Sequence, residues 1–427
     1  MIDFQPVILG CFLGVISGLL PGVGNFLLLL LATPFLLGFD PVSLIVCYIA
    51  LVSISQYIGS VPAVLYGVPG EASSFPAVLE SKRLSTSDQV SKAISGAAFG
   101  SFIGGLSVAV CCYFLLDYVE LIKYFFSTKL FVVIVCFALI IVCLVSGKNV
   151  LFNFLLVGFG LLLGLVGYNN FNNTDFLTFG NSYLYGGLPF MLVSIFLYAL
   201  PQLYQNFDAK KSTFVNEAED LSFYVPNIIS SCFNSVLGFL GGLFPGLTTI
   251  LSSYLAYFLS KAITDDPVKH IVSSETANNS GAFSQMLPLL LFGIPLLSSE
   301  AYLLTLLELK GIDVLDMSFS TIFVNISYSF ILINFIGLIL AWPLAKQVSF
   351  IYSFNFKTIF TCLGVLLLFV CAYIGYENNS LIFYLLIMLG LLPLTYIFRN
   401  VNTMPLVFAF LLHDTLFESI VRLTKLL

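Results

Sequence analysis

The sequence predicts an all-α polytopic membrane protein, and its composition, its recurring apolar segments and an internal repeat lead to that prediction. Of 427 residues, 59% are hydrophobic and only 9% are charged, whereas a soluble domain carries about 25% charged residues. A soluble protein of this composition would lack a polar surface, so lipid must solvate most of its side chains. We therefore expect a multi-pass protein whose surroundings are membrane lipid.

Apolar segments of the length that a bilayer requires, about 17 to 25 residues, recur along the chain. Segments 6–37 and 228–260 are too long for a single pass, and each contains a Pro-Gly pair. The stretch 70–92 and the linker 206–224 are polar enough to lie outside the membrane. The candidate spans cover residues 6–37, 42–69, 94–116, 128–147, 149–167, 186–204, 228–260, 283–307, 318–343, 358–375, 379–397 and 402–421.

Charge and motif content exclude several classes of function. The net charge of −6 and the pI near 4.9 argue against a nucleic-acid partner, because such proteins present clustered positive charge to the phosphates. The nine cysteines follow no metal-ligand spacing, and the isolated His270 and His413 form no paired metal motif. The spans lack a nucleophile–base pair, so we predict no enzymatic activity, no catalytic residue and no cofactor other than a transported ion.

Two related halves are visible in the sequence. Coincident Pro and Gly pairs indicate duplication, because only 17 of 427 residues are Pro. We predict a first transmembrane repeat over residues 1–205, a cytoplasmic linker over 206–224 and a second transmembrane repeat over 225–427. The pairs are Gly14–Gly238, Gly18–Gly242, Pro21–Pro245 and Gly22–Gly246 at a spacing of 224 residues, and Asp40–Asp266, Pro41–Pro267, Pro62–Pro288, Gly67–Gly293 and Pro69–Pro295 at 226.

The distribution of Lys and Arg predicts that the two repeats are inverted. Cytoplasmic loops carry an excess of these residues, which places loop 80–93 and the linker 206–224 in the cytoplasm. The basic residues that follow position 345 then place loop 308–317 outside, although it is the counterpart of 80–93. Inverted repeats are a common architecture of secondary transporters.

Each half has a first backbone break at its Pro-Gly pair. Pro removes a backbone donor and Gly permits dihedrals that a helix excludes, which gives a broken helix or a re-entrant hairpin. A simple kink is the alternative, but paired breaks in both halves point to a transporter binding site. The substrate-site residues that we assign here are Pro21, Gly22, Gly24, Asn25, Pro245, Gly246, Thr248 and Thr249.

A second break in each half combines Gly-x-Pro with two serines, in GVPGEASS (67–74) and GIPLLSSE (293–300). A helix that starts after the Pro would direct unpaired N–H groups and a partial positive charge at an anion. The serines would add donors, or they would only N-cap the new helix. The substrate-site residues assigned here are Gly70, Ser73, Ser74, Pro295, Ser298 and Ser299.

The segment SSETANNSGAFS (273–284) places Glu275, Asn278 and Asn279 on one helix face. A carboxylate within a membrane is costly and indicates function. Carboxylate and amide oxygens suit sodium, and a carboxylate alone suits a proton, so we assign Gln56, Glu275, Asn278 and Asn279 to a site for a coupling cation. Interhelical hydrogen bonding is the alternative. The first-half equivalent of this segment, SISQYIGS, contains Gln56 but no acid, so the halves are predicted to differ chemically.

These motifs resemble the large membrane subunit of the tripartite tricarboxylate transporters, the TctA family. Four first-half segments carry the resemblance: GLLPGVG (18–24), DPVSL (40–44), QYIGS (56–60) and VPGEASS (68–74). Three second-half segments carry it further: GLFPGLTT (242–249), ETANNSGA (275–282) and LPLLLFGIP (287–295). The combination of ETANN with a following GIP is its most specific part.

The resemblance implies a multi-pass symporter of small organic anions, di- or tricarboxylates, in the cell (inner) membrane of a prokaryote. It implies a proton or sodium gradient as the driving force, and a periplasmic or extracellular binding protein and a small membrane subunit as partners. Leu296 and Ser274 depart from the family pattern, where Gly and Pro are usual. A standalone carrier or channel for another small solute therefore stays open, as does the oligomeric state, a homodimer included.

Overall fold

Four predicted site residues, Pro21, Gly22, Pro245 and Gly246, lie outside the described part of the chain, and so does most of the predicted linker 206–224. The computed structural model describes residues 4–20, 23–115, 128–145, 149–169, 174–185, 187–206, 224–243, 248–312, 314, 319–353, 356–377, 380–410, 412–413 and 416–417.

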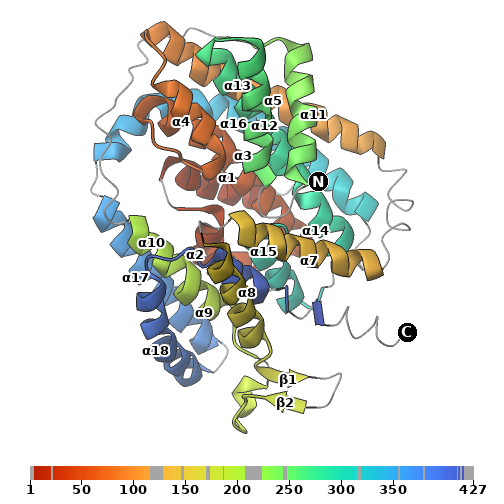
Figure 1. Cartoon of the computed structure of the whole chain (residues 1–427), viewed down its shortest axis with the longest axis vertical. Helices are drawn as coiled ribbons and strands as arrows, with labels where there is room; N and C mark the ends of the chain where they lie inside the picture. Colours follow the sequence, from red (N-terminus) through yellow and green to blue (C-terminus); the bar gives the residue numbers. More distant parts are fainter. Residues whose placement is uncertain are drawn as a thin grey trace.

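Helices make up nearly all of the described chain, which confirms the predicted class of a helical membrane protein. Strands β1 (Gly167–Asn169) and β2 (Thr174–Phe176) pair as a short antiparallel hairpin at the bottom of Figure 1. Five helices in the described ranges are long and apolar enough to cross a membrane. They are α3 (Pro41–Tyr66), α5 (Ser87–Leu115), α16 (Phe319–Ser353), α17 (Phe356–Glu377) and α18 (Leu381–Phe398).

The first half is interrupted at its Pro-Gly pair, as predicted. Helix α1 (Phe4–Leu19) ends before the pair and α2 (Asn25–Leu36) begins after it. Helix α3 continues through Pro62 and ends at Gly67, whose φ of 60° is left-handed. The remaining elements before the linker are η1 (Ala72–Ser74), α4 (Phe75–Ser81), α7 (Thr128–Val145), α8 (Val150–Gly164), η3 (Ser182–Leu184), α9 (Phe190–Ser194), the π-helical η4 (Ile195–Ala199) and α10 (Leu200–Asn206).

The second half is also interrupted near its Pro-Gly pair, since one helix ends at Gly242 and the next begins at Thr248. The candidate span 283–307 is interrupted at its predicted Gly-x-Pro break, because Gly293 at φ 67° ends one helix and Pro295 follows it. The stretch 70–92, which is predicted to lie outside the membrane, contains the short helix α4, and Glu80 on that helix is 1% exposed. The elements are α11 (Ile228–Gly242), α12 (Thr248–Ile263), α13 (Pro267–Ser284), α14 (Met286–Phe292) and α15 (Ser298–Leu309).

Helices α3 and α13 form the centre of the molecule. Helix α3 packs against α1, α16 and α13, and α13 packs against α5, α11 and α12 (Figure 1). Glycine allows the close approach of α1 to α3, because a Cβ on Gly14 would lie 2.7 Å from the Leu51 carbonyl oxygen. Small residues at helix interfaces are the usual means of close packing within membranes.

The two Asp-Pro pairs start helices α3 and α13. Asp40 Oδ1 accepts the N–H of Val42 at 3.0 Å and that of Ser43 at 3.2 Å at the start of α3. Asp266 Oδ1 accepts the N–H of Val268 at 3.0 Å at the start of α13. Each carboxylate thus satisfies backbone donors that a helix start leaves unpaired.

Candidate functional site

Glu71, for which the sequence predicts no role, lies beside Gln56. Gln56 Nε2 donates to Glu71 Oε2 at 2.6 Å, and Ser73 Oγ donates to Gln56 Oε1 at 3.0 Å. Glu71 is partly exposed as a residue, but its Oε1 is buried without a hydrogen-bond partner among the described residues. The segment 53–60 itself contains no acid, but the turn that follows α3 brings one beside Gln56.

Residues that flank the first Pro-Gly break lie beside Glu71. Ser17 on α1 donates to Asn25 Oδ1 at 2.7 Å and to the Val23 carbonyl oxygen at 3.0 Å. Ser17 and Asn25 both interact with the Glu71 carboxyl. Gly24 precedes α2 as its N-cap in an extended conformation. Helices α2 and α3 and the turn η1 thus bring the predicted site residues Asn25, Gln56 and Ser73 together.

Gly70 and Ser74 occupy different positions in the same turn. A Cβ on Gly70 would lie 2.1 Å from the Gly18 carbonyl oxygen and 2.6 Å from Gly59 Cα, so the loop requires Gly for its contact with α1 and α3. Ser74 is fully buried and its Oγ has no partner among the described residues. It precedes α4 without capping it through its side chain, so the N-capping alternative for this serine is wrong.

In the second half, Glu275 and Asn278 share one face of α13, as predicted. Asn278 Nδ2 donates to Glu275 Oε2 at 3.2 Å. Glu275 is 1% exposed and Asn278 is fully buried. Within the described ranges, Glu275 Oε1 and Asn278 Oδ1 have no hydrogen-bond partner. Buried acceptor oxygens without partners are costly unless a cation or a proton satisfies them.

Asn279 has a different environment from its neighbours. Its Nδ2 donates to the Ser101 carbonyl oxygen at 2.9 Å and to Asn334 Oδ1 at 3.0 Å. Asn334 Oδ1 also accepts from Tyr57 OH at 2.8 Å, and Ser53 Oγ donates to Asn279 Oδ1 at 3.4 Å. These bonds join α3, α5, α13 and α16, which favours the alternative of interhelical hydrogen bonding for Asn279.

The second-half turn at Pro295 contains an acid of its own. Glu300 Oε2 accepts the N–H of Leu296 at 2.6 Å and that of Leu297 at 3.2 Å. The N–H groups that were expected to face an anion are therefore occupied by a side chain. The N-cap of α15 is Leu297, so serine capping is wrong here too. Ser299 Oγ lies 2.9 Å from Tyr48 OH, whereas Ser298 Oγ has no partner among the described residues.

The remaining predicted residues are also buried. Thr248 and Thr249 are 2% and 7% exposed at the start of α12, and Pro295 is buried between α14 and α15. Helix α12 also contacts η1, so the second break of the first half touches an element of the second half. The second break of the first half and the helix that follows the first break of the second half are therefore neighbours.

The acidic side chains of this region lack basic partners among the described residues. Glu71 and Glu275 each keep one carboxylate oxygen buried without a hydrogen-bond partner among the described residues. In the part of the chain that the structure describes, no Lys, Arg or His pairs with Glu71, Glu275 or Glu300. An unneutralised pair of carboxylates is unfavourable at low dielectric, so this region is suited to bind a cation or a proton.

Glu71, Asn334 and Glu300 are site-region residues that sequence reasoning missed. Asn334 is an isolated amide in an apolar span, and Glu300 reads as an ordinary acid in a helix's first turn. Glu71 gave one usable signal, since it lies within the VPGEASS segment that we had singled out for its serines.

Broken helices and a buried polar interior are features of helical membrane transporters. The sequence model of the Tripartite tricarboxylate transporter TctA family matches residues 5–408. The chain therefore belongs to this family, as the motifs predicted, and membership implies the large membrane subunit of a tripartite system. It likewise implies a binding protein and a small subunit as partners.

Two relatives extend over most of the chain. It is 24% identical to an uncharacterized 52.8 kDa protein in the TAR-I ttuC' 3'region of Agrobacterium vitis, over 97% of this chain and 85% of that protein. It is 26% identical to an uncharacterized protein of Methanocaldococcus jannaschii, over 91% of each. No solved structure matches the chain.

Proposed function

We propose that the chain is the permease subunit of a symporter that moves di- or tricarboxylates with sodium ions or protons. One observation carries the proposal: Glu71 Oε1, Glu275 Oε1 and Asn278 Oδ1 are buried without partners among the described residues, in a region where no cationic side chain pairs with either acid. A coupling cation would satisfy these oxygens. Carboxylate and amide oxygens are the ligands that hard cations prefer.

The same charges explain how a cation would be coupled to an anionic substrate. An empty site with ionised Glu71 and Glu275 repels a carboxylate at short range, because the surrounding protein screens charge poorly. A bound cation neutralises part of that charge and makes the region favourable for the anion. Such mutual dependence of two ligands is a coupling free energy, and it acts equally in both directions.

Substrate oxygens require donors, and two buried hydroxyl groups are available. Ser74 precedes α4 and Ser298 begins α15, and neither Oγ has a partner among the described residues. Both positions lie just after the Gly-x-Pro turns of their halves. We assign Ser74 and Ser298 as substrate donors, and the Glu71–Gln56 and Glu275–Asn278 pairs to the cation. Asn279 leaves the predicted cation set, because its amide joins helices.

The proposal includes two repeats, and the packing of corresponding glycines supports them. A Cβ on Gly14 would lie 2.7 Å from the Leu51 carbonyl oxygen, and one on Gly238 would lie 2.2 Å from that of Ala277. These four positions correspond in the sequence repeat. Gly67 and Gly293 also correspond, and each ends its helix with a left-handed φ. We retain inversion in the proposal, since inverted repeats place such breaks near the middle of the bilayer.

Uptake by proteoliposomes tests the proposed function. The chain is reconstituted with the small membrane subunit and the binding protein of its system, and uptake of radiolabelled citrate and succinate is followed. Imposed sodium and pH gradients are applied separately. We expect one of them to drive accumulation, which stops when the gradient is collapsed. Equal uptake with and without both gradients would indicate a channel or a uniporter and would contradict the coupling.

Reconstitution without the two partners separates a tripartite permease from a standalone carrier. A tripartite permease needs its binding protein for uptake at low substrate concentration. A standalone carrier transports at the same rate when both partners are left out. Labelling of single cysteines placed in loops 80–93 and 308–317 from either side of the membrane tests the inversion, which predicts that the two loops react from opposite sides.

A further inference from the structure

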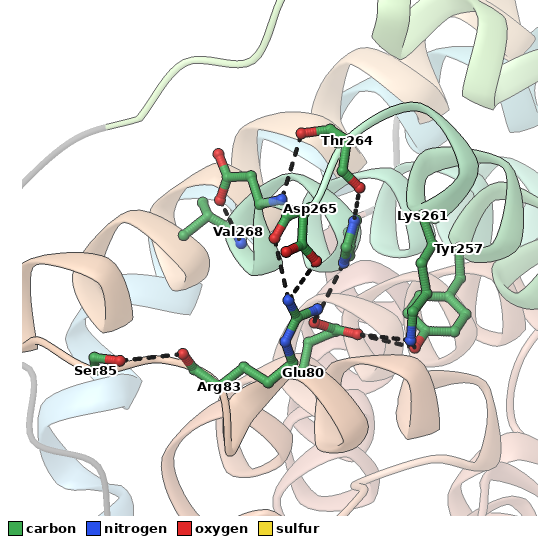
Figure 2. Close-up of polar contacts among 10 residues, drawn as sticks. Glu80, Arg83, Ser85, Tyr257, Lys261, Thr264, Asp265 and Val268 are labelled. Carbon is green, nitrogen blue, oxygen red and sulfur yellow. Dashed lines mark hydrogen bonds and ion pairs between the residues drawn. The ribbon is translucent and has the colours of Figure 1, made fainter.

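A second cluster of charged side chains, made of other residues than the proposed site, lies where α4 meets the connection between α12 and α13 (Figure 2). Its centre is Glu80, which is 1% exposed. Glu80 Oε1 accepts from Tyr257 OH at 2.9 Å, and Glu80 Oε2 accepts from Arg83 Nη1 at 2.8 Å. His270 on α13 is fully buried, and its Nδ1 lies 3.2 Å from Glu80 Oε2.

The partners of His270 determine where its ring protons lie. His270 Nε2 lies 2.8 Å from the Thr264 carbonyl oxygen. A carbonyl can only accept, so Nε2 must carry a hydrogen. In a neutral ring, Nδ1 would then present a lone pair to the Glu80 carboxylate. Nδ1 makes no hydrogen bond within the described ranges, and its contact with Glu80 is an ion pair only when the ring is protonated.

Glu80 is the acceptor in this contact. Burial alone would raise its pKa, but the hydrogen bond from Tyr257 and the proximity of His270 and Arg83 outweigh that effect and hold the pKa of the carboxyl below its usual range. Glu80 is therefore ionised at neutral pH and can pair with a protonated imidazole.

We propose that Glu80 and His270 form a proton-binding site that fastens α4 to the α12–α13 corner, and that the fastening loosens when His270 becomes neutral. The contact joins residue 80 of the predicted first repeat to residue 270 of the second. Protonation at this corner thus acts on the connection between the two repeats. The site is separate from Glu275 and adds a pH-dependent contact to the proposed transport.

The other charged groups around the pair make the loosening partial. Arg83 Nη2 bonds Asp265 Oδ1 at 2.6 Å, and Lys261 Nζ lies 3.8 Å from Glu80 Oε1. The Tyr257 ring contacts the His270 ring edge-on, with centroids 6.0 Å apart. At the start of α13, Lys269 pairs with the N-cap Asp266, and on α5 Lys92 pairs with Asp88. Arg83 and Lys261 therefore continue to neutralise Glu80 after His270 has lost its proton.

Nitrogen NMR of the histidine rings tests the proton directly. The chain contains two histidines, so selective ¹⁵N-histidine labelling gives two sets of ring signals, and His413→Gln identifies those of His270. We expect both ring nitrogens of His270 to be protonated at acidic pH, with Nδ1 alone losing its proton as the pH rises. An Nδ1 that stays unprotonated from pH 5 to pH 8 would overturn the proposal.

Thermal unfolding of the purified full chain in detergent tests the fastening. A contact that needs a proton stabilises at low pH and weakens as the pH rises, so Tm of the native chain should fall by about 2 to 5 °C between pH 5.5 and 8.5. In His270→Gln the amide donates at every pH, so this decline should disappear. In Glu80→Gln it should disappear or reverse, because an amide can donate to neutral Nδ1.

Asp265→Asn is the matched control. It removes the exposed Arg83–Asp265 pair and leaves the buried contact intact, so the decline of Tm with pH should persist. A decline that is unchanged in His270→Gln would refute the fastening. If His270→Gln fails to fold, the NMR titration of the native chain still decides whether Nδ1 binds the proton.

Discussion

Glu80 and Glu275 are both 1% exposed, yet their surroundings are opposite in charge. Glu80 contacts Arg83 and His270 and has Lys261 nearby. Glu275 contacts the neutral amide of Asn278 and keeps one oxygen unpaired among the described residues. The chain surrounds Glu80 with its own basic side chains and leaves Glu275 without a positive partner among the described residues. The first arrangement suits a contact within the protein, and the second suits a mobile cation.

The comparison also concerns stability. Breaking a buried pair by removing one partner costs about 3 to 5 kcal/mol, because a buried charge is left without compensation. A buried carboxylate without a positive partner should destabilise the folded state when its cation is absent. The two acids should therefore respond to substitution in opposite ways.

The largest expected effect is on transport. Glu275→Gln removes the charge that attracts the coupling cation, so gradient-driven uptake should fall at least about tenfold, which corresponds to a lost coupling of ~1.4 kcal/mol. Proteoliposome uptake under an imposed sodium or pH gradient measures it. Asp88→Asn, on an exposed pair, is the control and should transport normally. Intact coupled uptake by Glu275→Gln would remove this residue from the cation site.

The second prediction concerns Glu71 and its relation to Glu275. Glu71→Gln should also weaken gradient-driven uptake, by roughly tenfold, because it removes the other unpaired carboxylate of the region. If both acids serve one cation site, the double variant should be little worse than the Glu275→Gln variant, because residues that act as a unit are not additive. Additive losses in the same uptake assay would show two independent sites.

The third prediction tests the opposite responses in stability. Glu80→Ala should lower the unfolding free energy by about 3 kcal/mol, since it leaves His270 and Arg83 without their shared acceptor. Glu275→Gln should leave Tm unchanged or raise it in buffer without sodium. Thermal unfolding of both variants in the same detergent provides the measurement. Equal destabilisation by the two substitutions would contradict the proposed difference between Glu80 and Glu275.

The smallest expected effect is at the helix starts. Partial burial would raise the pKa of Asp40, but hydrogen bonds from Ser43 and Val42 outweigh it and hold this pKa below its usual value. The cap is thus fully formed at neutral pH and is lost as the pH falls through that lowered pKa. Asp40→Ala should cost ~1 kcal/mol at pH 7 and almost nothing well below that pKa. Asp266→Ala, the corresponding cap, should behave alike at pH 7, and denaturant titration compares them.

Local features of this chain could be predicted from the sequence, because they depend on neighbouring residues. Gly67 and Gly293 end their helices, and Asp40 and Asp266 begin theirs. The spacing of Glu275 and Asn278 was sufficient to place them on one face. The family could also be recognised from such short segments.

Contacts between distant residues could not be predicted in this way. Glu71 bonds Gln56 across a turn, Asn334 bonds Asn279 from another helix, and Glu80 lies beside His270. None of these pairs has a periodic spacing, and each consists of single polar residues in otherwise unrelated segments. Packing of the helices brings them together, so only the fold identifies them.

The bonds around Asn279 have a mechanical consequence. Asn279, Asn334, Tyr57 and Ser101 hold α3, α5, α13 and α16 together through buried amide, hydroxyl and carbonyl groups. If one of these helices slid past another, several hydrogen bonds would break at once. No water is present in the membrane interior to replace the lost partners. These four helices should therefore travel as a single rigid body, and the surface along which the molecule slides should lie between this body and the helices outside it.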